Sequence, residues 1–152
     1  RFSGIDLEQV TRRFDFGEMT GLVRGSFSNV ELFGAVPVSF RGRVRSERGG
    51  TVNVRAVRNI AVLGGSSPTI FDRGLTRLFQ RFTYSGLGIE MRLKNDVFRL
   101  KGLEHRGDKE LFLKGRLPLP IDVVNGDPGR AVSFRAMLDR FRSLDLSQVE
   151  AR

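Results

Sequence analysis

The sequence predicts an α+β fold: a twisted, largely antiparallel and curved β-sheet with three amphipathic helices packed on one face or capping its ends. Two observations support this. Apolar residues recur at helical spacing in residues 6–14, 71–82 and 133–144, and they alternate with polar residues in much of the sequence between these segments. The apolar stripes of the helices need a sheet to cover them, because one hairpin is too small to bury them.

The first helix is expected to begin after Asp6, which can act as an N-cap and is followed by Gln9 three residues later. Its inward-facing residues would be Leu7, Val10 and Phe14. Alternation then predicts long strands at residues 22–33 and 36–44. Asn29 marks a turn or bulge within the first of them.

The next segment is also expected to be extended. After a turn at residues 47–50, Val52, Val54 and Ala56 alternate with polar residues. The alternation slips after Ala56, which suggests a β-bulge before a further strand at residues 60–63.

A helix followed by a hairpin forms the centre of the predicted fold. The helix has one apolar stripe, made of Phe71, Leu75, Leu78, Phe79 and Phe82. Alternation at residues 89–93 and 98–102 predicts the two strands of the hairpin. Lys94-Asn95-Asp96 has the composition of the turn that joins them.

Shorter elements are expected toward the C-terminus. Residues 104–108 form a turn, and residues 111–113 and 121–124 are strand-like. Pro118 and Pro120 restrict the segment at residues 117–120 to an edge strand or an extended connection. Ser133 caps the last helix, whose stripe is Phe134, Met137, Leu138, Phe141 and Leu144. We expect seven residues of the two later helices to be buried against the strands: Leu75, Leu78, Phe79, Phe82, Phe134, Leu138 and Phe141.

Composition narrows the range of functions. The chain of 152 residues is read as a single domain, residues 1–152, with no cysteine, one histidine and a net charge of +9. Without cysteine there is no disulfide, thiolate nucleophile or Cys-bound zinc. His105 is expected in a solvated turn, and neither a carboxylate pair nor a Gly-x-Ser-x-Gly elbow is present. We therefore predict no enzymatic activity, no catalytic residue, no metal and no cofactor.

The arginines give one candidate binding surface. Arg41, Arg43 and Arg45 share one face of a predicted strand, and Arg55 on the next strand would extend it. Guanidinium groups bind phosphates well. Binding of nucleic acid or another polyanion and protection of a sheet edge by charge both remain open. Nucleic acid is not favoured, because the aromatic residues lie on apolar stripes.

The apolar strand faces give the other candidate. A long curved sheet can leave part of its apolar face uncovered as a groove that a lipid chain would fill, although most such residues belong to a core. The candidate residues for groove or core are Val36, Val38, Phe40, Val52, Val54, Phe98 and Leu100.

Several short motifs follow one another along the chain: FSGI at 2–5, GLVRG at 21–25, VRNI at 57–60, LFQRFTY at 78–84, KNDVFRLKGL at 94–103, PIDVVN at 120–125 and VSF at 132–134. In this order they resemble the bacterial AsmA-like and TamB-like envelope proteins, which have a repeating β-groove. The resemblance is closest to the C-terminal region of the YdbH-type branch.

This resemblance implies a non-enzymatic module of the Gram-negative envelope. The chain would be the C-terminal fragment of a larger protein, anchored in the inner membrane, that crosses the periplasm and conducts phospholipid along an apolar groove. The implied partners are phospholipid and, near the outer membrane, a small lipoprotein or a barrel protein.

A fragment of such a sheet is expected to have an open edge. Pro118 and Pro120 disfavour pairing on their side. The edge should therefore lie near residues 22–33 or 36–44, where a partner would add a strand by β-augmentation or a second copy would form a dimer. Neighbours within the chain for both of these strands would contradict this expectation.

Overall fold

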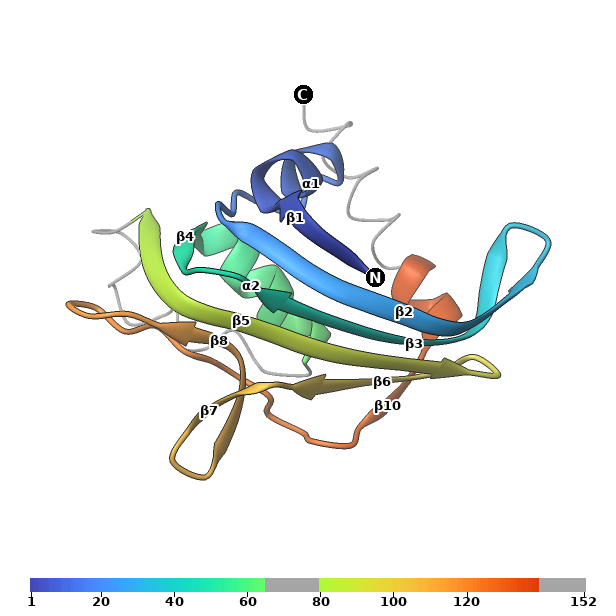
Figure 1. The fold of residues 1–152 in the computed structure, drawn as a ribbon. Coiled ribbons are helices and arrows are strands. Elements are labelled where there is room, and N and C mark those ends of the chain that lie inside the picture. Colours follow the sequence, from blue (N-terminus) through green and yellow to red (C-terminus); the bar gives the residue numbers. More distant parts are fainter. Residues whose placement is uncertain (65–79, 140–152) are drawn as a thin grey trace, which may run out of the picture.

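The computed structural model describes residues 1–64 and 80–139, and its ten strands form one strongly curved sheet (Figure 1). All strand pairs are antiparallel, which confirms the predicted α+β class. The elements are, in order, β1 (Phe2–Asp6), α1 (Leu7–Arg13), β2 (Leu22–Phe33), β3 (Val36–Ser46), β4 (Gly50–Asn53), α2 (Val54–Leu63), β5 (Arg81–Lys94), β6 (Val97–Gly102), β7 (Glu104–Arg106), β8 (Lys109–Gly115), β9 (Val123–Val124) and β10 (Ala131–Ser133). Residues 134–139 are helical.

Helix α1 begins as predicted, because the Asp6 carboxylate accepts a hydrogen bond from the Glu8 amide at 2.9 Å. Its buried residues are Leu7 and Thr11, one turn apart. Val10 and Phe14 are 38% and 74% exposed, so the expectation that they face inward is wrong. The Thr11 hydroxyl replaces them on the inner face, where it donates to the Leu7 carbonyl at 2.8 Å.

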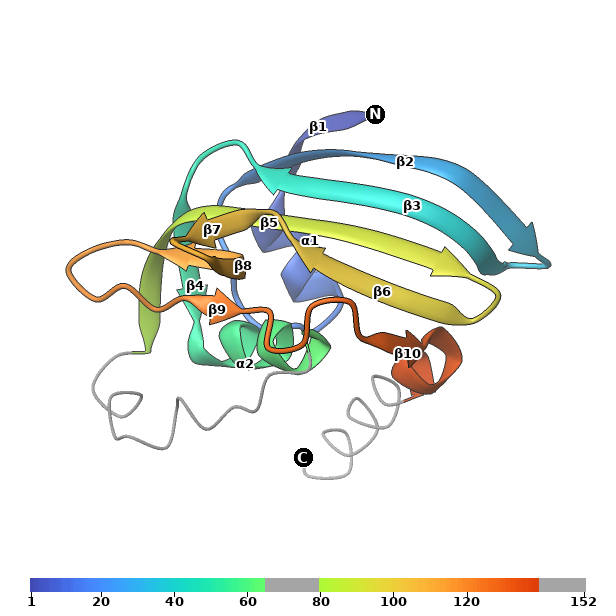
Figure 2. The same ribbon diagram turned by 90° about the horizontal axis from the view of Figure 1, so that it is seen from below.

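Strand β5 connects the two halves of the sheet (Figures 1 and 2). Residues 81–87 pair with β4 and β8, whereas residues 88–94 pair with β3 and β6. Since the neighbour changes midway on each side, the sheet turns a corner at β5. The corner needs close backbone approach: a Cβ atom at Gly49 would lie 2.2 Å from the Tyr84 carbonyl oxygen.

The extended structure expected beyond Asn53 is wrong. Residues 54–63 form α2, which begins where the Asn53 side chain accepts a hydrogen bond from the Ala56 amide at 2.9 Å. The β-branched residues favoured a strand. Helical spacing nevertheless places one set on the buried side of α2: Ala56, Val57, Ile60 and Ala61.

The predicted central helix lies mostly outside the described residues, since Phe71, Leu75, Leu78 and Phe79 fall in residues 65–79. Its expected end at Phe82 is wrong, because Phe82 belongs to β5 and pairs with Val52. Phe82 is nevertheless buried, as expected. The predicted hairpin is confirmed as β5 and β6, with the turn at Asn95 and Asp96.

The last helix is fixed to this turn. Ser133 caps it as predicted, with its hydroxyl oxygen accepting from the Ala136 amide at 3.1 Å. Asp96 accepts from the Arg135 amide at 2.8 Å and from the Ser133 hydroxyl at 2.6 Å. Phe134 and Leu138 are half-buried rather than buried, and Phe141 and Leu144 lie outside the described residues.

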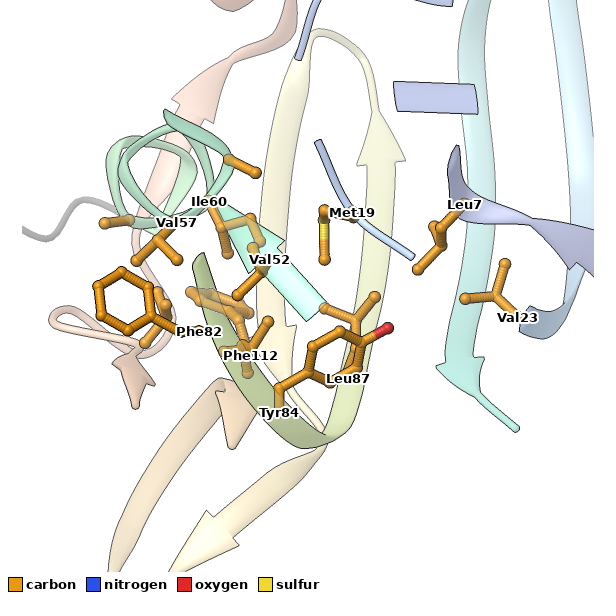
Figure 3. Packing of buried hydrophobic residues seen from close by; sticks show 14 residues of the cluster. Leu7, Met19, Val23, Val52, Val57, Ile60, Phe82, Tyr84, Leu87 and Phe112 are labelled. Atoms are coloured by element: carbon orange, nitrogen blue, oxygen red, sulfur yellow. The ribbon is translucent and has the colours of Figure 1, made fainter. Parts of the chain in front are cut away.

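The main core lies between α2 and the corner of the sheet. Figure 3 shows Val57 and Ile60 of α2 beside Val52, Phe82 and Phe112 of the strands. The core is completed by Leu7, Met19, Val23, Ala56, Ala61, Tyr84, Leu87, Leu113 and Val123.

The turn expected at residues 104–108 is shorter in the structure, because β7 and β8 enclose only Gly107 and Asp108. The segment with Pro118 and Pro120 is a connection, as predicted, and Val123–Val124 forms the short β9.

The expected open edge at residues 36–44 is wrong, since β3 pairs with β2 on one side and, from Ser39 to Arg45, with β5 on the other. Strand β2 also has two neighbours, so the expectation fails in its general form. However, β1 pairs with β2 only along Leu22–Gly25. The outer side of β2 from Ser26 to Phe33 has no partner strand within residues 1–64 and 80–139.

Candidate functional site

The sheet formed by β2, β3, β5 and β6 has one apolar and one basic face. Cross-strand neighbours share a face, so the register assigns each side chain. The apolar face contains Phe27, Phe40, Gly42, Val44, Ile89, Met91, Leu93, Phe98 and Leu100. The basic face contains Arg24, Arg41, Arg43, Arg45, Arg92, Lys94, Arg99 and Lys101.

A cavity of about 290 Å³ lies on the apolar face, between the sheet, α2 and the last helix. Most of its wall comes from α2, β5, β6 and the last helix. Its lining residues are Phe40, Ile60, Leu63, Ile89, Met91, Phe98, Leu100, Phe112, Phe134, Met137 and Leu138. All of these side chains are apolar, so the cavity offers dispersion contacts and no side-chain hydrogen bond or charge.

A row of phenylalanine rings crosses the same face. Phe2 stacks on Phe27 at a centroid distance of 6.0 Å, and Phe27 meets the edge of Phe40 at 5.8 Å. Phe40 and Phe98 then contact Phe134 at 6.2 and 5.4 Å. The rings extend the apolar face from β1 to the last helix.

Glycine makes room for this row. A Cβ atom at Gly42 would lie 2.6 Å from the Phe27 ring and 3.1 Å from the Met91 side chain. The missing side chain therefore allows the Phe27 ring to pack directly against the backbone of β3 at Gly42.

Three of the predicted groove residues line the cavity: Phe40, Phe98 and Leu100. The others have different positions. Val52 is completely buried in the core, and Val54 is the half-buried first residue of α2. Val38 is half-buried on β3, and Val36 is 53% exposed at the β2–β3 turn.

Sequence reasoning missed the remaining lining residues. Ile89 and Met91 were recognised as strand residues of one face, and pairing of β5 with β6 would have placed them beside Leu100. Ile60 and Leu63 were missed because α2 was expected to be a strand. Their spacing of three residues was the available signal for a helix.

The predicted arginine row on β3 is real, and two of its members are neutralised. Arg43 donates to the Glu90 carboxylate at 2.7 Å, and Arg45 lies 3.4 Å from a carboxylate oxygen of Glu104. The hydrogen bond from Arg43 holds the pKa of Glu90 below its ordinary value of 4.5, and the positive charges of Arg43, Arg92 and Lys101 act in the same direction.

Arg55 does not extend the row, so that part of the prediction is wrong. It lies on α2 and forms a two-pronged contact with the Asp15 carboxylate, with both N–O distances at 2.9 Å. Arg55 lies away from the row because the chain forms helix α2, and not a strand, after Asn53.

Other cations of the basic face have no carboxylate partner within residues 1–64 and 80–139. These are Arg24, Arg41, Lys94 and Arg99, whose side chains form no ion pair there. All four residues are exposed. The face is therefore available to anions.

His105 lies exposed on β7, opposite Glu110 of β8. Among the described residues no group of three or more potential ligands could hold a metal ion. No helix in that part of the chain is long and apolar enough to span a bilayer.

Comparison of the chain with protein-family models, with curated proteins and with solved structures finds no match. The apolar cavity and the basic face are therefore the basis of the functional argument.

Proposed function

We propose that this chain is a non-enzymatic lipid-binding module that holds phospholipid acyl chains in the apolar cavity of its curved sheet. The observation that carries the proposal is the cavity of about 290 Å³, to which the described residues contribute only apolar side chains. This is roughly twice the ~150 Å³ of an apolar cavity that stays dry and binds benzene. Transfer of hydrocarbon into it gains about 0.8 kcal/mol for each buried CH₂ group.

The chemistry of the wall supports binding without catalysis. None of the lining residues within 1–64 and 80–139 carries a titratable or nucleophilic side chain that could transfer a proton or attack a bound ester. The phosphate headgroup would remain outside, where charge stays hydrated.

The proposed location is the periplasm, within a protein anchored in the inner membrane that reaches the outer membrane. It rests on the resemblance of the motif order to AsmA-like and TamB-like proteins. The KNDVFRLKGL motif at residues 94–103 forms the turn and strand β6 beside the cavity, so this motif helps to build the proposed lipid site.

Binding of a nucleic acid or another polyanion is the second candidate function. The cations without an ion pair on the basic face favour it, whereas the pairing of Arg43, Arg45 and Arg55 weakens the site that the sequence suggested. The two functions differ in salt dependence. Polyanion affinity falls steeply with salt, because phosphate contacts release counterions, but acyl-chain affinity does not.

We also propose that a lipoprotein or barrel protein of the outer membrane adds a strand to the outer side of β2 at Ser26–Asn29. The unpaired outer side of that stretch supports this. The chain has no native cysteine, so a photoreactive cross-linker attached to the thiol of Ser28→Cys should label such a partner, and the same reagent on Ser39→Cys of the interior strand β3 should not. Cross-linking between two copies of the Ser28→Cys chain would instead indicate a dimer, and equal yields at both positions would contradict the proposed edge.

The cavity is tested by titrating the protein with a fluorescent fatty acid at low and high salt. Leu100→Trp and Met137→Trp add bulk to its wall and should weaken binding at least tenfold, because a filled cavity excludes the chain. Val97→Trp is the matched control, since Val97 lies on strand β6 but not in the cavity wall. Equal binding by all variants, or a steep loss of affinity with salt, would contradict the proposal.

A further inference from the structure

The end of the β2–β3 hairpin is an exposed apolar tip, which we define as residues 30–37. Its side chains Val30, Leu32, Phe33 and Val36 are 53%, 62%, 82% and 53% exposed. Glu31 is its only charged residue. Figure 1 shows this end of the hairpin, in light blue, bending away from the rest of the sheet.

The bend begins at Asn29, which has a left-handed φ of 52°, and the β2–β3 register shifts between Ser28 and Glu31. Beyond the shift both faces of the hairpin are apolar. Phe33 pairs with Val36, and Leu32 pairs with Pro37. A hairpin that is inserted into a lipid interface has apolar surroundings on both faces.

Cations of the basic face lie next to the tip. Ser39, two residues after the tip on β3, pairs with Lys94, and Arg41 pairs with Arg92. Arg92 in turn pairs with Arg99. Figure 2 shows the β2–β3 and β5–β6 turns at the same end of the molecule, so the strand positions that carry these cations lie at the same end as the apolar tip.

The spacing suits a bilayer surface. Val36 and Arg41 are five residues apart, which is roughly 17 Å along a strand at about 3.3 Å for each residue. An apolar element that sinks about 5–10 Å into the headgroup region would bring Arg41 to within roughly one Debye length, about 8–10 Å, of the anionic surface.

We infer that the β2–β3 tip inserts into the interface of an anionic phospholipid bilayer, with Arg41, Arg92, Lys94 and Arg99 facing its headgroups. Apolar insertion and electrostatic attraction are the two contributions that hold peripheral proteins on membranes. The inference uses residues outside the cavity wall, so it stands or falls separately from the proposed acyl-chain binding.

The chain has no tryptophan, so a single introduced tryptophan reports its own surroundings. Phe33→Trp places it in the tip. Leu117→Trp is the matched control, because Leu117 is 77% exposed and lies in the β8–β9 connection at the opposite end of the molecule (Figure 2). The probe is mixed phosphatidylcholine and phosphatidylglycerol vesicles with brominated acyl chains.

Addition of these vesicles should shift the emission of the Phe33→Trp protein to the blue and quench it, and should leave the Leu117→Trp protein unchanged. Equal quenching at both positions, or quenching at neither, would overturn the inference. A blue shift that depends on protein concentration without vesicles would assign the tip to contact between two copies and would also overturn it.

Vesicle sedimentation separates the two contributions. Phe33→Asp should abolish binding, and Arg41→Gln should weaken binding to anionic vesicles by about fivefold, the factor expected for ~1 kcal/mol per charge near the surface. Both residues are exposed, and unchanged thermal unfolding will verify that the variants fold. Full binding by Phe33→Asp would show that charge alone suffices and that the tip does not insert. Leu100→Trp should bind vesicles normally while its cavity is filled.

Discussion

Tyr84 shows at the scale of one residue how the corner of the sheet is held. Its ring is completely buried, and its hydroxyl donates to the Thr20 carbonyl at 2.7 Å. Gly21 allows this approach, because a Cβ atom there would lie 2.7 Å from the hydroxyl oxygen. Tyr84 therefore ties β5 to the segment that leads into β2.

Tyr84→Phe should lower the free energy of unfolding by about 1–2 kcal/mol, because it leaves a buried carbonyl without its donor. Burial raises the pKa of Tyr84 from 10.0 to about 12, so this residue stabilises the fold fully below pH 10 and loses that contribution as the pH rises toward 12. Urea unfolding from neutral to alkaline pH should show a shallower alkaline decline for the variant. Parallel declines would contradict this account of Tyr84.

The arginines show what a sequence can and cannot predict for single residues. Alternation correctly places Arg41, Arg43 and Arg45 on one face of a strand. Whether these arginines form ion pairs depends on Glu90 and Glu104, which are 47 and 59 positions along the chain from their partners Arg43 and Arg45. Spacing within one strand contains no information about such partners.

At the scale of elements, local signals were sufficient where turn chemistry was strong. Asn95 and Asp96 adopt left-handed φ values of 50° and 66°, as the turn of a tight hairpin requires, and the predicted hairpin is present. Helix α2 was missed because Val54, Val57 and Val62 favour strands locally. Burial of one helical face against the strands decides the outcome.

Asn53 is the residue at which strand changes to helix. Asn53→Ala should destabilise the protein by about 1 kcal/mol, because it removes the side-chain acceptor for the Ala56 amide at the start of α2. Arg58→Ala, at an exposed position within the same helix, is the control and should have little effect. Urea unfolding measures both, and an equal loss in the two variants would show that the cap is not the cause.

The candidate groove was only partly predictable for a related reason. The face of Phe40, Phe98 and Leu100 follows from alternation within each strand. Alternation does not determine which strands are neighbours. At the corner formed by β5, Val52 lies in the core and not in the groove. The closing wall comes from Ile60 of α2 and Phe134 of the last helix, whose docking depends on long-range packing.

At the scale of the whole molecule, one sheet separates two chemistries. Its apolar face and helices line the cavity, and its opposite face carries six arginines, of which Arg41, Arg92 and Arg99 lie toward the β2–β3 tip. Since strand residues alternate between faces, a single set of strands presents hydrocarbon-binding and anion-binding surfaces back to back. This division matches the two parts of a phospholipid, its acyl chains and its charged headgroup.

Native mass spectrometry of the protein purified from a Gram-negative host tests the central claim most directly. The account predicts that the wild-type chain and Val97→Trp retain a bound mass that extraction identifies as phospholipid or fatty acid. Leu100→Trp, with its cavity filled, should lose that mass. A lipid-free wild type that also fails to take up added phospholipid, or the same lipid load on Leu100→Trp, would contradict acyl-chain binding in the cavity.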